Sequence, residues 1–478
     1  MVLWGGLSAL AGSYIIPSPW STLLETGAVL SDWYNWKQIL ITLWRVAAGF
    51  VGAFLLGSFI GIATGRKTLL EAVFRPVVLF LQGIPPLLWA IPVILLFGIG
   101  HVSPVLVITL ICLPLVTLNT AQGMKTVPVP LEEMMKVFAS GDFPRLKEIV
   151  FPHLKPFFSA SLKLGITLGI KASVIGEYFG ANNGIGFQIQ SAYQSLQIRR
   201  LFSWGLVLIV LILFSSRLVM LFEKTKRMLS SALQKSYTVH LNAKRPDNFR
   251  DVLEGKKPAA SFFMKNVSYS YPKKDEDTAG SSGARILERV SINLNENEHA
   301  VITGESGTGK TTLLKIAAGI LQPQRGNVIR PEKIGFVFQD DRFIPWRTVL
   351  ENCALPLVYQ GFGKRESFFH AHNLLSEFGL KGYETKMPDE ISGGMKKRAA
   401  LARCFLRIPD LVILDEPFSG LHKEARAFLW DKFFHLLEMY PGQALIVTHY
   451  PEEVVQYSHL SFYTLQGSPA SLKPNDNP

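Results

Sequence analysis

The sequence predicts a multidomain protein in which an all-α transmembrane domain of about six helices precedes an α/β domain. Hydrophobic residues make up 48% of the 478 residues, and in the first half they form runs long enough to span a bilayer. Residues 261–470 alternate between strand-like and helix-like segments, as the chains of α/β sheets do. Residues 304–311 have the sequence GESGTGKT, which matches the phosphate-binding pattern G-x-x-x-x-G-K-[ST].

Composition divides the chain into four segments. We expect a membrane domain at 1–225, a linker at 226–260, a nucleotide-binding domain at 261–470 and a tail at 471–478. The net charge is +12, and most Lys and Arg residues of the first half lie between apolar runs, which favours cytoplasmic loops over nucleic-acid binding. The three cysteines have neither CxxC nor His-rich spacing, so we expect neither disulfides nor zinc.

Six apolar runs are candidate membrane spans. They cover residues 2–16, 39–63, 76–98, 102–120, 160–180 and 201–222. The first is short against the roughly 20 residues that a span needs. We interpret it as a truncated or tilted span, and disfavour a cleaved signal peptide because no basic segment precedes the run. Prolines and a glycine interrupt the third run, and irregular backbone at membrane depth is tolerated where it lines a cavity.

Loop charge predicts the orientation of these spans. Arg66 and Lys67 follow the second run, five Lys or Arg residues lie between the fourth and fifth, and Lys224, Lys226 and Arg227 follow the sixth. With six spans all three groups fall on one side, which the preference of Lys and Arg for cytoplasmic loops identifies as the cytoplasm. We therefore expect a multi-pass protein of the bacterial cytoplasmic membrane, with the α/β domain in the cytoplasm.

Lys171 and Glu177 are charged residues inside the fifth run. A charge within a span is costly and often functional, so Lys171 is a candidate cation on the path of an anionic solute. The alternative is a paired or water-facing structural position. Glu177 follows six residues later, about 240° around a helix, so it does not share a stripe with Lys171, and we expect it near the outer interface.

The GESGTGKT loop predicts a site for ATP and Mg²⁺. A β-run (300–302) precedes it and a helix-forming run (312–318) follows it, so backbone N–H groups and a helix N-terminus can surround phosphate oxygens. Lys310 would reach the β- and γ-phosphates, and the Thr311 hydroxyl would bind Mg²⁺. The candidate nucleotide-binding residues here are Gly304, Glu305, Ser306, Gly307, Thr308, Gly309, Lys310, Thr311 and Thr312.

The charged loop at 121–159 contains a candidate docking helix near 131–141. Leu131, Met134, Met135 and Phe138 have helical spacing, which indicates a short surface helix that docks onto a partner or, alternatively, packs on its own domain. This loop resembles the E-A-A loop of ABC importers. The resemblance lies in the sequence Glu-Met-Met at 133–135, Ala139 and the sequence Val-Phe-Pro at 150–152. That family's coupling helix sits in a groove of the ATP-binding domain. Here methionines replace two alanines and an alanine replaces the glycine, so we expect a groove of different shape.

Five further motifs occur in the order that ABC ATPases show. They are Tyr271, Gln339, the sequence ISGGM with Ser392, Gly393 and Gly394, the strand-end acids Asp415 and Glu416, and His449. The resemblance implies that Tyr271, or alternatively Tyr269, stacks on adenine. It implies that Gln339 and Asp415 reach Mg²⁺, that Glu416 activates the attacking water and that His449 contacts the γ-phosphate. The ISGGM segment resembles the signature that binds the γ-phosphate held by the other subunit. His422 stands where the family has an aspartate, which implies weaker coupling between the two nucleotide sites.

The resemblance covers nearly the whole chain and implies an ABC importer with permease and ATPase fused. The sequences GIPPLLWAIPVILLFGIG at 83–100 and FQDDRFIPW at 338–346 are similar to those of the nitrate, sulfonate and taurine group, which includes relatives for thiamine-precursor pyrimidines. The implied partners are a second copy of the chain, an external solute-binding protein, membrane lipid and a small-molecule solute, with no nucleic acid. The alternatives are an exporter and an ATP-binding regulator without turnover.

Overall fold

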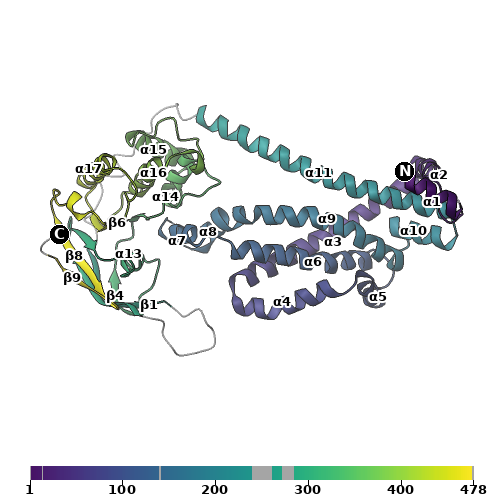
Figure 1. The fold of residues 1–478 in the computed structure, drawn as a ribbon, viewed down its shortest axis with the longest axis horizontal. Helices are drawn as coiled ribbons and strands as arrows, with labels where there is room; N and C mark the ends of the chain where they lie inside the picture. The colour runs from purple at the N-terminus through teal and green to yellow at the C-terminus, as the bar shows by residue number, and fades with distance from the viewer. Residues whose placement is uncertain (1, 13, 139–140, 240–260, 272–284, 476–478) are drawn as a thin grey trace. The chain divides into compact units, whose positions relative to one another are not determined.

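The computed structural model describes residues 2–12, 14–138, 141–239, 261–271 and 285–475 (Figure 1). The chain forms two compact units, Met1–Val127 with Val150–Ser231, and Pro128–Ile149 with Ala232–Pro478. The charged loop between two membrane helices therefore belongs to the same unit as the α/β domain. Ala139, the linker residues 240–260, the polar insert at 273–284 and the tail residues 476–478 lie outside the described residues.

In the part of the first unit that the structure describes, all the regular elements are helices. Its helices are α1 (Val2–Ala11), α2 (Pro19–Ser31), α3 (Trp33–Arg66), α4 (Thr68–Gly83), α5 (Pro86–Phe97), α6 (Val102–Lys125), α9 (Phe151–Gly180), α10 (Ile185–Gln194) and α11 (Ile198–Val239). Among the described residues four helices are long and apolar enough to cross a membrane, and the pair α4 and α5, bent by 100°, would make a fifth span. The predicted interruption of the third run is this bend.

The predicted first span at 2–16 is not a single helix. Gly12 has φ 81°, a left-handed conformation that ends α1 after ten residues. Ser18 then caps α2 by accepting a hydrogen bond from the Ser21 N–H, with Pro19 at the first helical position. Ten helical residues reach about 15 Å, half the thickness of the hydrocarbon layer. Removing this span leaves the predicted side of every later loop unchanged.

Close packing between α3 and α6 depends on small residues. A Cβ at Gly57 would lie 2.9 Å from the Val116 Cβ, and one at Gly61 would lie 2.6 Å from the Thr120 Cβ. Glycines four residues apart let two membrane helices approach closely, since lipid provides no hydrophobic drive for association. The core beside this contact contains Phe50, Ile108 and Cys112, among others.

Glu177 has a partner that the sequence did not reveal. Its carboxylate forms an ion pair with Arg45 of α3 at 2.9 Å, and both side chains are fully buried. The Thr42 hydroxyl and the Gly186 N–H also donate to the carboxylate. The expectation of an interfacial Glu177 thus missed a buried ion pair between α3 and α9. Lys171 is exposed on α9, so its place on a solute path stays a prediction.

The second unit is built on a nine-stranded sheet in the order β4-β1-β2-β9-β8-β3-β7-β6-β5. The strands are β1 (Phe262–Ser270), β2 (Arg285–Leu294), β3 (His299–Thr303), β4 (Arg325–Ile329), β5 (Ile334–Val337), β6 (Leu411–Asp415), β7 (Gln443–Val447), β8 (Leu460–Gly467) and β9 (Ala470–Pro474). β8, β3, β7, β6 and β5 pair in parallel. β3, β6 and β7 are almost wholly buried and apolar, as parallel strands covered on both faces are.

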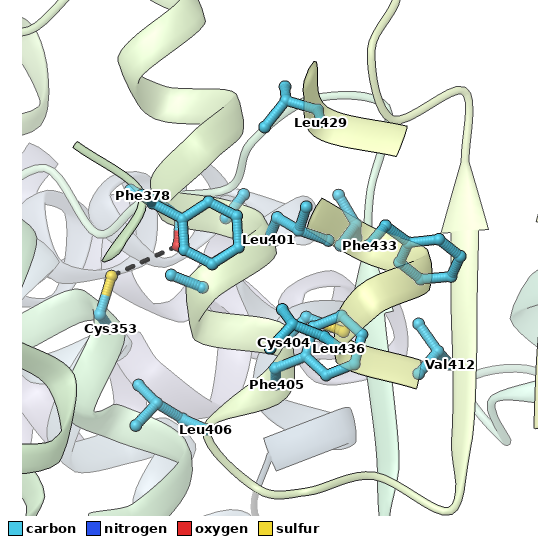
Figure 2. Close-up of a cluster of buried hydrophobic side chains, with 14 of the residues drawn as sticks. Cys353, Phe378, Leu401, Cys404, Phe405, Leu406, Val412, Leu429, Phe433 and Leu436 are labelled. Carbon is cyan, nitrogen blue, oxygen red and sulfur yellow. Dashed lines mark hydrogen bonds between the residues drawn. The ribbon is translucent and has the colours of Figure 1, made fainter. Parts of the chain in front are cut away.

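Helices complete the second unit. They are α7 (Val129–Phe138), α8 (Asp142–Arg145), a π-helical turn (Leu146–Val150), α13 (Lys310–Ala317), α14 (Val349–Tyr359), α15 (Lys364–Glu377), α16 (Gly393–Phe405) and α17 (Lys423–Met439). Figure 2 shows the core in which Leu401 and Phe405 of α16 meet Phe433 of α17. Cys353 and Cys404 are buried there as free thiols, and burial raises the pKa of each to about 12.

Candidate functional site

The predicted site residues follow the carboxyl ends of neighbouring parallel strands. The phosphate loop follows β3, Gln339 lies two residues after β5, Glu416 follows β6 and His449 lies two residues after β7. Parallel strands end at one edge of a sheet, so segments far apart in sequence meet there. This topology explains why residues 304 to 449 can form one site.

The phosphate loop is held in a curved conformation by glycine. Gly309 has φ 97°, and a Cβ there would lie 2.7 Å from the Ile286 Cγ2, so this position requires glycine. The Lys310 ammonium is nearly buried and donates to the carbonyls of Gly304 at 2.7 Å and Glu305 at 2.8 Å. Because α13 begins at Lys310, the loop combines a cation with a helix N-terminus, a suitable arrangement for phosphate.

Thr311 and Asp415 form the candidate Mg²⁺ site. The Thr311 hydroxyl donates to the Asp415 Oδ1 at 3.3 Å, and Asp415 is 2% exposed. Burial, with a smaller contribution from the charge of Glu416, raises the pKa of Asp415 to about 6. The described residues hold no cluster of three His, Cys, Asp or Glu side chains able to bind a metal. One carboxylate and one hydroxyl fit Mg²⁺, which takes its remaining ligands from substrate phosphates and water.

Replacing Asp415 by Asn is expected to stabilise the nucleotide-free protein in a pH-dependent way. The folded-state pKa lies above the ordinary value of 3.8, so ionisation costs the folded state free energy from about pH 4 and fully above pH 6. A rise from 3.8 to about 6 corresponds to a few kcal/mol of free energy. Thermal melting at about pH 5 and pH 8 should show the gain at the higher pH. The exposed Asp389→Asn control should show no such gain, and an equal gain for Asp415→Asn at both pH values would contradict the prediction.

Glu416 is the centre of a three-residue hydrogen-bonded group. The Gln339 Nε2 donates to its Oε2 at 3.2 Å, and the His449 Nε2 lies 2.8 Å from its Oε1. Glu416 has φ 46°, which is strained for a residue with a side chain. The Glu416 N–H donates to the Val447 carbonyl, and the Ser419 hydroxyl donates to the Glu416 carbonyl. The backbone is thus held so that the carboxylate faces Gln339 and His449.

The two candidate adenine-stacking tyrosines differ in exposure. Tyr271 is 44% exposed and its hydroxyl lies 3.3 Å from the Thr312 hydroxyl at the start of α13. Tyr269 is 8% exposed and packs edge-on against Tyr271. An exposed ring beside the phosphate loop suits stacking better than a buried one, so the geometry favours Tyr271.

The signature residues make their contacts outside the group around Glu416. Ser392 caps α16 by accepting from the Met395 N–H at 3.3 Å. A Cβ at Gly394 would lie 3.5 Å from Leu421, next to His422. Open glycine backbone at a helix N-terminus is what an anion from another subunit would require.

His422 occupies the N-cap of α17 without a side-chain capping hydrogen bond. Aspartate is among the best residues at this position, so His422→Asp is expected to stabilise the protein by about 1 kcal/mol. Differential scanning calorimetry would measure the gain as a rise of a few degrees in the melting transition. The same substitution at His435, inside α17, provides the control, and an equal rise there would exclude capping as the cause.

The docking helix α7 binds residues that no motif identified. Glu133 accepts from Lys315 of α13 at 2.8 Å and from Arg342 at 2.9 Å. A second carboxylate, Glu148 in the π-helical turn, is held by Arg347 and by the Tyr359 hydroxyl. All these residues belong to the second unit. Lys315 lies five residues after Lys310, and Arg342 lies three residues after Gln339. Their closeness in sequence to these motif residues was the one signal that could have identified them.

Comparison with known proteins extends over both halves of the chain. Residues 287–419 match the family model described as ABC transporter, and residues 53–228 match the one described as binding-protein-dependent transport system inner membrane component. The formylaminopyrimidine import ATP-binding protein ThiZ of Halalkalibacterium halodurans is 37% identical over 42% of this chain and 77% of its own length. The aliphatic sulfonates import ATP-binding protein SsuB 2 of Paraburkholderia xenovorans is 34% identical over 40% of this chain and 81% of its own. A solved dimeric ATP-binding cassette with ADP and Pi is 26% identical over 45% of this chain and 97% of its own, with a TM-score of 0.39.

Proposed function

The chain belongs to the ABC transporters, as an importer-type inner-membrane protein that carries permease and ATP-binding domain in one polypeptide, and on this premise we propose which solute it imports and how ATP drives it. The proposed solute is small and either anionic, such as a sulfonate, nitrate or taurine, or a heterocycle of the thiamine-precursor type. One observation carries the proposed coupling: Glu133, in a loop between two membrane helices, is bound by Lys315 beside the phosphate loop.

The proposed chemistry assigns one task to each residue of the site. Lys310 leaves the carbonyls of its own loop and binds phosphate oxygens. Glu416 accepts a proton from the attacking water, and its hydrogen bonds with Gln339 and His449 hold its carboxylate in position. Thr311 and Asp415 would hold Mg²⁺, which supplies charge neutralisation at the phosphates. Catalysis is then mostly positioning and electrostatic stabilisation.

A homodimer is proposed because the signature and the phosphate loop serve different ATP molecules. Each chain has one phosphate loop and one signature helix, so a two-fold, head-to-tail pair makes two complete sites. Closure of the pair would move both docking helices and reorient the membrane helices attached to them. The solute would arrive from an external binding protein, in keeping with the family model matched by residues 53–228.

The named relatives support the proposed solute class in part. One is named for formylaminopyrimidine import and the other for aliphatic sulfonates import, and both are ATP-binding proteins. Solute choice would depend on the membrane unit. Its Arg45 is paired with Glu177, whereas Lys171 is exposed on α9 and available to an anion.

Uptake into proteoliposomes tests the proposal. The chain, reconstituted with its binding protein, is expected to accumulate labelled taurine, alkanesulfonate, nitrate or formylaminopyrimidine when ATP is enclosed. For an anionic solute, Lys171→Ala should reduce uptake by roughly tenfold and leave basal ATPase activity intact. Arg199→Ala is the matched control, because Arg199 is also exposed and lies at the start of a different helix, α11. ATP-dependent loss of solute from vesicles would indicate an exporter, and ATP binding without turnover would indicate a regulator.

A further inference from the structure

Arg403 is a fully buried cation in the last turn of α16. It is 1% exposed and lies one helix length from the signature residues at the start of α16. Its Nη2 donates to the Asp341 carbonyl at 2.7 Å and its Nη1 to the Arg342 carbonyl at 3.0 Å. The guanidinium therefore fastens the signature helix to the segment that follows Gln339.

The same guanidinium contacts the docking helix. Its Nη1 donates to the Met134 sulfur at 3.4 Å, and its Cζ lies 5.4 Å from the centre of the Phe138 ring. Met134 is completely buried and Phe138 is 2% exposed, so both are among the side chains that pack α7 within the second unit. Four residues later, the Arg407 Nη1 donates to the Val137 carbonyl at the end of α7, where a cation is favourable.

These contacts explain why an arginine at position 403 and a methionine at position 134 suit each other chemically. A planar guanidinium can donate in several directions at once and lie over an aromatic ring, which an ammonium does less well. Methionine adds a polarisable acceptor where alanine, the residue of the related loop, would leave a gap. The bulkier Met134, a departure evident in the sequence, is thus accommodated by the buried cation.

We propose that Arg403 is a positioning residue that joins the signature helix to the docking helix, so that each docking helix responds to both nucleotide sites of the dimer. This rests on the proposed dimer. On one side, Glu133 binds Lys315 of the helix that begins at Lys310, which holds the ATP of its own chain. On the other, Arg403 contacts Met134 from the helix whose signature would hold the ATP of the second copy.

Hydrogen–deuterium exchange of the full chain in lipid nanodiscs tests this link. In a Glu416→Gln background, which should hold ATP, adding ATP is expected to slow exchange of the α7 amides by at least about threefold. Arg403→Gln should reduce this response to nearly none. Arg398→Gln is the control, because Arg398 lies on α16 and donates to the Phe378 carbonyl. An unchanged α7 response in Arg403→Gln, or no response in the parent, would overturn the proposal.

A variant on the docking helix distinguishes loss of the contact from misfolding of the second unit, which Arg403→Gln could cause. Met134→Ala removes the sulfur and leaves Arg403 in place, so it should also weaken the response of α7 to ATP. Combined with Arg403→Gln it should add little, since both changes break one contact. A normal response in Met134→Ala, or additive losses, would contradict the proposal. A chain that shows the exchange response and imports no solute would instead refute the proposed transport function alone.

Discussion

Replacing Glu416 by Gln is expected to reduce ATP hydrolysis by roughly 10²- to 10⁴-fold, the usual contribution of a general base. Glutamine keeps the size of the side chain and can hydrogen-bond with Gln339 and His449, and it enters the same left-handed backbone position. What is lost is the ability to accept a proton from water. ATP binding should persist, because the phosphate loop is unchanged, so ATP-bound dimers should accumulate.

Phosphate release measures turnover of the Glu416→Gln variant, and size-exclusion chromatography of the detergent-solubilised chain with and without ATP measures the dimer. Glu424→Gln provides the control, since Glu424 is an exposed carboxylate in the first turn of α17. Normal hydrolysis by Glu416→Gln would remove this residue from catalysis. Loss of ATP binding in the variant would mean that the substitution disturbs the strained backbone instead.

Most of the predicted structure of the nucleotide-binding half came from short sequence motifs. A strand, a glycine-rich turn and a helix are contiguous at 300–318, so their chemistry could be inferred from short patterns. The meeting of Gln339, Glu416 and His449 also follows from chain order, because each comes after a buried strand in the parallel part of one sheet. Their catalytic roles remain predictions, and Glu416→Gln tests the role of Glu416.

Contacts between distant segments could not be predicted. Glu133 lies 182 positions from Lys315 and 209 from Arg342, and no periodicity relates them. Arg45 and Glu177 likewise look like isolated charges within apolar runs until the fold pairs them. The break within residues 2–16 was missed for another reason: hydropathy measured the apolar length of this run, whereas Gly12 ends α1 and Ser18 and Pro19 begin α2.

Charge reversal at Glu133 is expected to separate ATP hydrolysis from transport. Its two partners are 16% and 7% exposed, so Glu133→Arg would place three cations together with little solvent screening. Losing the ion pairs should weaken the docking of α7 by about 2 kcal/mol, a factor of roughly 30. Uptake should fall by at least about tenfold. Basal ATPase activity should remain, because Glu133 does not contact Gln339, Glu416 or His449 among the described contacts.

Parallel measurements of uptake and ATPase activity in proteoliposomes would reveal this separation. Lys136→Glu is the matched control, because Lys136 is exposed on the same helix and this substitution also reverses one unit charge. Adding Lys315→Glu to Glu133→Arg should restore part of the uptake by re-forming a pair of opposite sign, which a general loss of folding could not do. If Glu133→Arg imports solute at the normal rate, the ion pairs at this carboxylate do not carry force from ATP to the membrane helices. We would then expect the link to lie in the contacts of Arg403 with Met134 and Phe138 on the same helix.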